Sequence, residues 1–215
     1  MMLPTMLYNI PLYSQISTIS PTTSSVKQET PIKAPIVMPY DVPLYSQIAD
    51  ISSVEWKQKG CGVTDVAMLV NYYKPKTTNV QAVLEAGIKS GAYVKNVGWS
   101  HTGLASLAKK YGLHGEEKSF YDFNKETAFN EFKKIIDEGP AIASIHRNFD
   151  PELSFGHLVV ITGYDDKLVY YNDPGKHDGI RTVSISSFMS GWKRKLIVIR
   201  PPIETESKTQ LALAN

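Results

Sequence analysis

The sequence predicts an α+β fold, in which helices come first and a mainly antiparallel sheet follows. Between Val54 and Asp137 the apolar residues recur at steps of three and four, which is typical of helices with one buried face. After Gly139-Pro140 the apolar runs become short and are separated by turn residues, which is typical of strands. Helices in the first half and an antiparallel sheet in the second indicate the α+β class.

Four helices are expected in the first half. The third is expected to begin with Thr102 as its N-cap and to end at Gly112, because a side-chain hydroxyl suits a helix start and a glycine suits a helix end. Gly139-Pro140 stops the fourth. The expected bounds are 61–73, a second helix that opens at 80, 102–112, and 124 or 125 to 137.

The second half contains short runs of the β type, each bounded by turn residues. The expected strands are 141–146, 158–162, 168–171, 182–185 and 196–199.

The beginning of the chain contains a near-repeat. Residues 6–16 recur as 38–48, and the match extends to 19–20 and 51–52. Ser, Thr and Pro dominate the stretch between the copies, which is typical of an extended linker. We therefore expect a flexible Ser/Thr/Pro-rich arm over 1–35 that contains a near-repeat of 38–52, a folded domain over 36–202 and a C-terminal tail over 203–215. An alternative hypothesis is that the first copy occupies the strand position or groove of residues 40–48.

Composition excludes several classes of partner. The chain has 23 Lys and Arg against 21 Asp and Glu, a net charge of +2, and no long basic block, so nucleic acid is not expected. No apolar run approaches the roughly 18 residues of a membrane span, so stable membrane insertion is not expected either. A single cysteine excludes an internal disulfide. The first residues do not resemble a signal peptide, which leaves a cytoplasmic location and export by another route both open. We expect a monomer.

Cys61 is the candidate nucleophile. It lies between two glycines at the expected start of a helix, where unpaired backbone N–H groups and the helix dipole favour the thiolate. The glycines are expected to let a substrate backbone come close. About a hundred residues later, His157 begins the most apolar strand, and Asp173 follows the next one. A cysteine, a histidine and an acid in this order are the parts of a thiol-based acyl-transfer site.

The other histidines are weaker candidates for the base. His146, which ends the preceding strand, is the second choice. His101, His114 and His177 are expected at the surface. No ligand spacing among the histidines suggests zinc, so neither a metal nor another cofactor is expected.

The third catalytic group depends on a turn. Side chains alternate between the two faces of a strand, so the loop after Tyr164 decides which residue shares a face with His157. A two-residue loop pairs Tyr164 with Lys167 and places Asn172 there, whereas a three-residue loop pairs it with Leu168 and places Asp173 there.

The motifs together resemble the papain-like cysteine peptidases, and among these the peptidases that cut bacteriocin leaders after a double glycine and their stand-alone relatives. The resemblance covers about residues 40–200 and departs from the family at Val63, where relatives commonly carry proline. The matching strings are VPLYSQ (42–47), GCGVTDVAML (60–69), GW (98–99) with GLA (103–105), GPA (139–141), GHLVVITGY (156–164) and NDP (172–174).

The resemblance implies a papain-like fold and a Cys61–His157–Asp173 triad. The relatives' Asn-Asp-Pro pattern favours Asp173 over Asn172. It also implies an oxyanion hole formed by the Cys61 N–H and the side chain of Gln47, with Gln58 as the alternative. Trp56, Trp99 and Trp192 are expected in the core and are left out of the site.

The expected activity is therefore that of a cysteine peptidase, which hydrolyses peptide bonds of a peptide or protein substrate through a Cys61 acyl-enzyme. Cleavage after small residues such as Gly-Gly is the family expectation. The alternatives are a catalytically silent peptide-binding module and an amidase or acyltransferase that acts on cell-wall peptides.

Overall fold

The computed structural model describes residues 39–176 and 178–203. The predicted arm over 1–35 and the first copy of the near-repeat lie outside these residues, as does His177. The predicted tail lies outside them except for Ile203.

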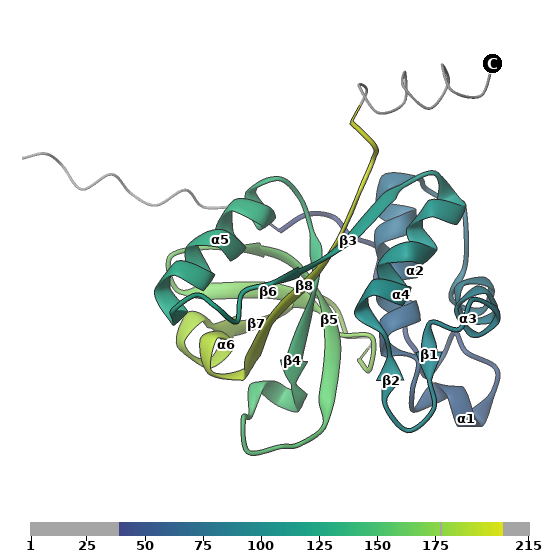
Figure 1. The fold of residues 1–215 in the computed structure, drawn as a ribbon, viewed down its shortest axis with the longest axis horizontal. Helices are drawn as coiled ribbons and strands as arrows, with labels where there is room; N and C mark the ends of the chain where they lie inside the picture. The colour runs from purple at the N-terminus through teal and green to yellow at the C-terminus, as the bar shows by residue number, and fades with distance from the viewer. Residues whose placement is uncertain (1–38, 177, 204–215) are drawn as a thin grey trace, which may run out of the picture. The chain divides into compact units, whose positions relative to one another are not determined.

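Four helices and a short 3₁₀ turn are built from the first half of the described chain (Figure 1). Asn124 caps α5 by accepting a hydrogen bond from the Thr127 N–H. The expected cap of α4 is wrong by two residues, since Ser100 and not Thr102 accepts from the Gly103 N–H. Gly112 ends the 3₁₀ turn in the left-handed conformation, as a helix-ending glycine commonly does. The bounds are α1 Val54–Lys57, α2 Cys61–Tyr73, α3 Val80–Lys89, α4 His101–Leu107, η1 Ala108–Tyr111 and, further on, α5 Lys125–Asp137.

The sheet has six strands in the order β3-β8-β4-β5-β6-β7, and every neighbouring pair is antiparallel. All five expected strands are present. The sequence missed β3, and it missed α6 (Ile185–Gly191), which begins where a strand residue was expected. Helices together with an antiparallel sheet confirm the predicted α+β class. The strands are β3 His114–Ser119, β4 Ala141–His146, β5 Gly156–Tyr164, β6 Leu168–Asn172, β7 Arg181–Ser184 and β8 Trp192–Arg200, with η2 Arg147–Phe149 after β4.

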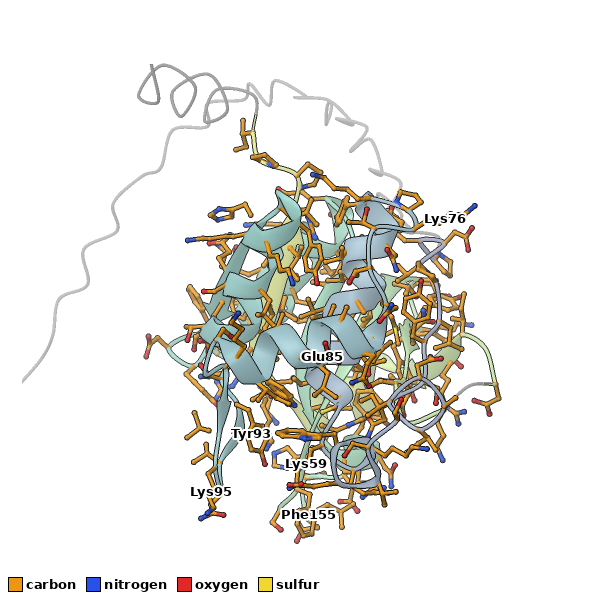
Figure 2. All side chains as sticks on the ribbon, turned by 90° about the vertical axis from the view of Figure 1, so that its right-hand side faces the viewer. Lys59, Lys76, Glu85, Tyr93, Lys95 and Phe155 are labelled. Atoms are coloured by element: carbon orange, nitrogen blue, oxygen red, sulfur yellow. The ribbon has the colours of Figure 1, made fainter. Side chains whose placement is uncertain are left out.

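A small hairpin stands apart from the main sheet. Its strands are β1 (Tyr93–Val94) and β2 (Gly98–Trp99). Trp99 Nε1 donates a hydrogen bond to the Lys59 carbonyl at 2.5 Å, which ties the hairpin to the loop before α2. In Figure 2, Lys59, Tyr93 and Lys95 lie at one end of the domain, and Lys76 lies at the opposite end.

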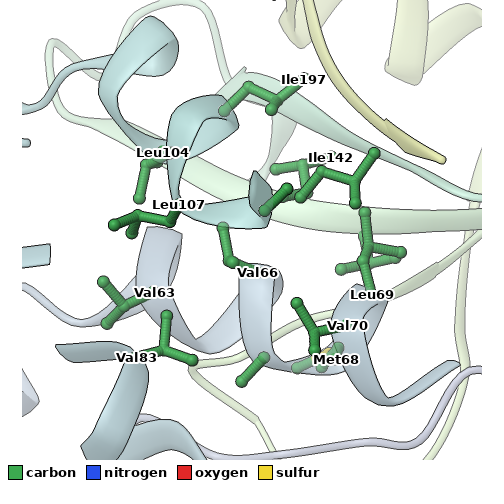
Figure 3. Close-up of a cluster of buried hydrophobic side chains, with 14 of the residues drawn as sticks. Val63, Val66, Met68, Leu69, Val70, Val83, Leu104, Leu107, Ile142 and Ile197 are labelled. Atoms are coloured by element: carbon green, nitrogen blue, oxygen red, sulfur yellow. The ribbon is translucent and has the colours of Figure 1, made fainter. Parts of the chain in front are cut away.

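The two faces of the sheet bury different clusters. Alternate residues of β4, β5 and β8 face α2, α3 and α4, for example Ile142, Val160 and Ile197 (Figure 3). The residues between them, such as Ala143, Val159 and Leu196, face the cluster that contains Phe132 of α5 and Phe188 of α6. This strict alternation is the period of a strand with both faces covered, and it explains why these runs are almost entirely apolar.

The C-terminal end of α5 is tied to both ends of the described domain. The Arg200 guanidinium donates to the carbonyls of Ile135, Gly139 and Pro140, and the Tyr40 hydroxyl donates to that of Ile136. Cationic groups at this end of a helix satisfy carbonyls that lack a partner within the helix.

None of the helices in residues 39–176 and 178–203 is long and apolar enough to cross a membrane.

Candidate active site

Cys61 is the first residue of α2, as the sequence predicts. The N-cap, Gly60, provides no side-chain cap, and the Cys61 backbone N–H has no acceptor within the described part of the chain. The unpaired N–H groups of a first helical turn form a natural place for a negative charge. The thiol therefore lies where an anion is stabilised.

The glycines beside Cys61 serve the packing of the protein itself. A Cβ on Gly62 would lie 2.5 Å from Leu104 Cδ1 and 3.1 Å from Leu158 Cδ1, and one on Gly60 would overlap Ile51. The room expected for a substrate backbone on this side is thus filled by side chains. Their closeness fixes the start of α2 against α4 and β5.

His157 and Asp173 form a hydrogen-bonded pair beside Cys61. His157 Nε2 lies 2.7 Å from Asp173 Oδ1, and the two side chains are only 17% and 16% exposed. The Gly175 N–H also donates to Asp173 Oδ1, at 2.8 Å, which holds the carboxylate in place. Because Nε2 is taken by Asp173, Nδ1 is the ring nitrogen left for the Cys61 thiol.

The turn that decides between Asp173 and Asn172 contains three residues, 165–167, which is one of the two expected lengths, but Tyr164 pairs with Val169 instead of Leu168. A register shift between Ile161 and Gly163 then restores the expected pairing of Val160 with Asn172. This bulge offsets the one-residue difference in pairing, so the strands end with Asp173 at His157. Asn172 is buried and donates from Nδ2 to the Val42 carbonyl at 3.0 Å.

The charges of the pair reinforce each other. Burial lowers the pKa of His157, but hydrogen bonds to Asp173 and to Cys61 outweigh it and raise the pKa to about 10. Burial raises the pKa of Asp173, but the hydrogen bond from His157 outweighs it and holds the pKa below its usual range. The imidazolium and the carboxylate thus persist through neutral pH, which suits a histidine that stabilises a thiolate and later gives up a proton.

Asp65 is a fully buried carboxyl group one helical turn after Cys61, and the sequence did not identify it as part of the site. Neither of its oxygens has a hydrogen-bond partner within residues 39–176 and 178–203. Burial first, and then the nearby Cys61, raise the pKa of Asp65 well above its usual range. It therefore carries a proton where most aspartates are ionised, which avoids placing a bare charge in the core.

Cys61 and His157 line a cleft of about 660 Å³. Trp99 and Tyr93 line one part of it, and Phe155, which is 72% exposed, lines another. Lys59, Tyr93 and Phe155 lie at the same end of the domain in Figure 2. An open cleft with aromatic walls and a few polar groups is typical of a ligand-binding site.

One expectation about the surroundings of the cleft is wrong. Trp99 is half-buried and packs against the apolar core as expected, and it also lines the cleft, whereas Trp192 is buried. His101 was expected at the surface, but its side chain is 18% exposed, lines the cleft and lies 3.4 Å from Glu117 Oε1. Burial, only partly opposed by Glu117, lowers the pKa of His101. The polar strand β3 that carries Glu117 covers this histidine, and that strand was not foreseen.

The remaining predicted site residues are placed as follows. Gln58 lines the cleft with Cys61. Gln47 is buried, donates from Nε2 to the Lys57 carbonyl at 2.7 Å, and has its Cβ close to Gly60. His146 lies at the end of β4 with Nδ1 3.0 Å from the Leu153 carbonyl oxygen, outside the lining of the Cys61 cleft, and His114 is exposed.

Solved structures share this fold. A putative C39-like peptidase from Bacillus anthracis has a TM-score of 0.57 and 21% identity over 78% of this chain and 100% of that one. A double glycine motif protease from an AMS/PCAT transporter, solved in complex with a leader peptide, has a TM-score of 0.53 and 22% identity over 76% and 94%. At these identities the likeness shows the fold, and it confirms the papain-like architecture that the sequence predicts.

A sequence relative and a family model agree with this. The Bacillus subtilis (strain 168) "Uncharacterized protein YvpB" is 27% identical over 168 residues, which are 63% of this chain and 65% of YvpB, so the chain spans less than two thirds of that relative. The model described as "Peptidase_C39 like family" matches residues 39–195, which include Cys61, His157 and Asp173. The protein therefore belongs to the Peptidase_C39-like family.

Proposed function

We propose that this protein is a cysteine peptidase in which Cys61, His157 and Asp173 form the catalytic triad. The observation that carries the proposal is the 2.7 Å contact between His157 Nε2 and Asp173 Oδ1 next to the chain's single thiol. The position of that thiol at an uncapped helix N-terminus supports the same assignment.

The reaction follows from these positions. The Cys61 thiolate attacks the carbonyl carbon of a peptide bond, and the carbonyl oxygen becomes negative. The His157 imidazolium then gives its proton to the leaving amine, which leaves a thioester on Cys61. Water then attacks the thioester while His157 takes its proton, the acid product leaves, and Cys61 returns to the thiolate beside the His157 imidazolium. Asp173 orients the ring throughout, as the acid of a triad does.

The oxyanion hole is proposed to consist of the Cys61 N–H and the amide of Gln47. The N–H supports this because it has no other acceptor within the described residues. Gln47 lies next to Gly60 and has one amide hydrogen left after its bond to Lys57. Gln58 is the alternative, since it lines the cleft. Loss of one oxyanion donor costs about 10²–10³ in kcat, so Gln47→Ala and Gln58→Ala distinguish the two.

The substrate is proposed to be a peptide cut after small residues such as Gly-Gly. The family membership supports this, and so does the leader peptide bound to the double glycine protease of similar fold. The aromatic cleft fits an extended chain.

Mass spectrometry of a peptide library tests the proposal. Wild type and His114→Ala, an exposed histidine that serves as the matched control, are expected to give the same cleavage pattern. Cys61→Ala and His157→Ala are expected to give none. A folded wild type that cuts nothing, but binds the library peptides, would instead favour the silent binding module.

A further inference from the structure

Lys193 lies in a bulge of β8 beside the cleft. Ser144 pairs with Lys195, but its neighbour Ile145 pairs with Trp192, so Lys193 and Arg194 have no partners on β4. Arg194 has a φ of 50°, a left-handed conformation that is rare for a residue with a side chain. Lys193 and Lys195, two residues apart on β8, both line the Cys61 cleft.

The ammonium group of Lys193 lies close to the residue that precedes the catalytic histidine. Its Nζ is 3.2 Å from the position that a Cβ on Gly156 would take, and Gly156 precedes His157. Glycine at this position leaves space for the ammonium. Lys193 is half-buried, and no carboxylate of residues 39–176 and 178–203 lies within ion-pair distance of it.

The other cations near the cleft already have partners. Lys195 is 2.8 Å from Glu117, and Lys59 is 2.9 Å from Glu55. Arg194 donates to the carbonyls of Tyr121 and Phe123. Lys193 is thus the cleft lysine that has a charge to offer to a ligand.

The cationic surface continues beyond the cleft. Lys193 and Tyr121 also line a second hollow of about 470 Å³, together with Lys125, His146 and Arg194. Neither hollow is lined by a described Asp or Glu, although the whole protein has a net charge of only +2. A surface that gathers positive charge around a nucleophile attracts anionic partners and repels cationic ones.

We infer that Lys193 binds a carboxylate of the peptide substrate close to the scissile bond, so that the site selects acidic peptides. The inference rests on the proposed peptidase function. The carboxylate has two possible sources, an acidic side chain and a free peptide C-terminus. Either would supply the counterion that the half-buried ammonium lacks.

The first test uses the single cysteine as a probe that needs no turnover. Iodoacetate and iodoacetamide differ by one negative charge, and Cys61 is the only thiol in this chain that they can label. The iodoacetate rate divided by the iodoacetamide rate, normalised to the same ratio for mercaptoethanol, is expected to fall about threefold to tenfold in Lys193→Gln at low salt. Lys193→Arg is expected to restore the ratio. Lys89→Gln, an exposed lysine at the end of α3, is expected to match wild type.

The second test uses quenched-fluorescent peptides with Gly-Gly before the scissile bond. Each pair carries Glu or Gln at one of three positions on either side, and a further pair has a free or an amidated C-terminus. At one of these positions the acidic member is expected to have the higher kcat/KM in wild type, and this preference is expected to disappear in Lys193→Gln. The pair that shows it identifies the source of the carboxylate.

The outcomes separate the two claims. Equal labelling ratios in Lys193→Gln and Lys89→Gln, or equal cleavage of all peptide pairs, would overturn the role of Lys193 even in an active peptidase. A wild type that cuts no peptide would overturn the proposed function, while a labelling ratio that depends on Lys193 would still support an anion-selective cleft.

Discussion

Replacement of Asp65 by asparagine tests whether this buried carboxyl group, one helical turn after Cys61, carries a proton in the folded protein. The folded protein keeps this carboxyl protonated, because it is fully buried and no described hydrogen bond compensates its charge. The unfolded chain ionises it above a pKa of about 3.9. Folding therefore takes up a proton between that pH and the raised pKa of the folded state. The sign follows: the unfolded state binds fewer protons, so the free energy of unfolding falls as the pH rises.

The magnitude follows from the same linkage. With Asp65 protonated in the folded state throughout, the interval from pH 4.5 to 5.5 reduces the stability of wild type by about 1.2 kcal/mol relative to Asp65→Asn, which has no proton to exchange. In this interval His157 is protonated in both states, since its pKa lies at about 10 when folded and at 6.5 ordinarily. The titration of His157 therefore does not contribute to this change in stability.

Urea unfolding at the two pH values measures the difference between wild type and Asp65→Asn. The control is Asp173→Asn, because Asp173 has a lowered pKa and is ionised in the folded state at both values. Its difference from wild type is expected to change by only about 0.1 kcal/mol, the residual titration of the unfolded chain. If the difference in stability between wild type and Asp65→Asn changes as little between the two pH values, Asp65 is ionised in the folded protein, and the argument from its burial is refuted.

Three further predictions concern the pair, the packing and the helix end. Asp173→Asn removes a charge that raises the pKa of His157, so the alkaline limb of the kcat/KM pH profile, expected near pH 10 in wild type, should move to lower pH. An alkaline limb at the wild-type pH would contradict the pairing of His157 with Asp173. Gly115→Ala would place a methyl group on the Ala105 backbone carbonyl, which costs about 2 kcal/mol and should lower Tm by about 4–8 °C in a thermal melt. Gly156→Ala, whose methyl meets only Lys193, is the comparison, and equal Tm values would show that the strand yields freely. Arg200→Met removes a guanidinium that donates to three carbonyls near the end of α5, so urea unfolding should show a loss of about 2–3 kcal/mol.

The local pattern of the sequence was enough to predict the main helices, the central strands and the placement of Cys61 and His157. Each of these depends on residues close in the chain, such as the apolar run after His157. Strand β3 was missed because its residues, HGEEKS, are polar on both faces; only its pairing with β8 makes it a strand. The cap of α4 was misplaced because Ser100 and Thr102 are both good caps, and the sequence alone does not rank them.

The rest of the site depends on contacts between distant segments. His101 is buried by Glu117, 16 residues away on β3. The position of Asp173 depends on a bulge that offsets the pairing of Tyr164 with Val169, and no turn residue signals that bulge. Lys193 lies in a second bulge, seen only where β8 meets β4.

The place of β8 in the sheet bears on how the protein is made. Among the described residues, β8 is the last strand in sequence, yet it lies between β3 and β4 and joins them. A ribosome therefore releases both neighbours long before the strand that pairs them, and until then β4 presents an open edge. Because β8 also carries Lys193 and Lys195, one wall of the cleft is absent from the nascent chain. The thiol of Cys61 emerges early, but its cleft is completed only when residue 200 has left the ribosome. A chain that is still being synthesised is therefore not expected to cut other proteins.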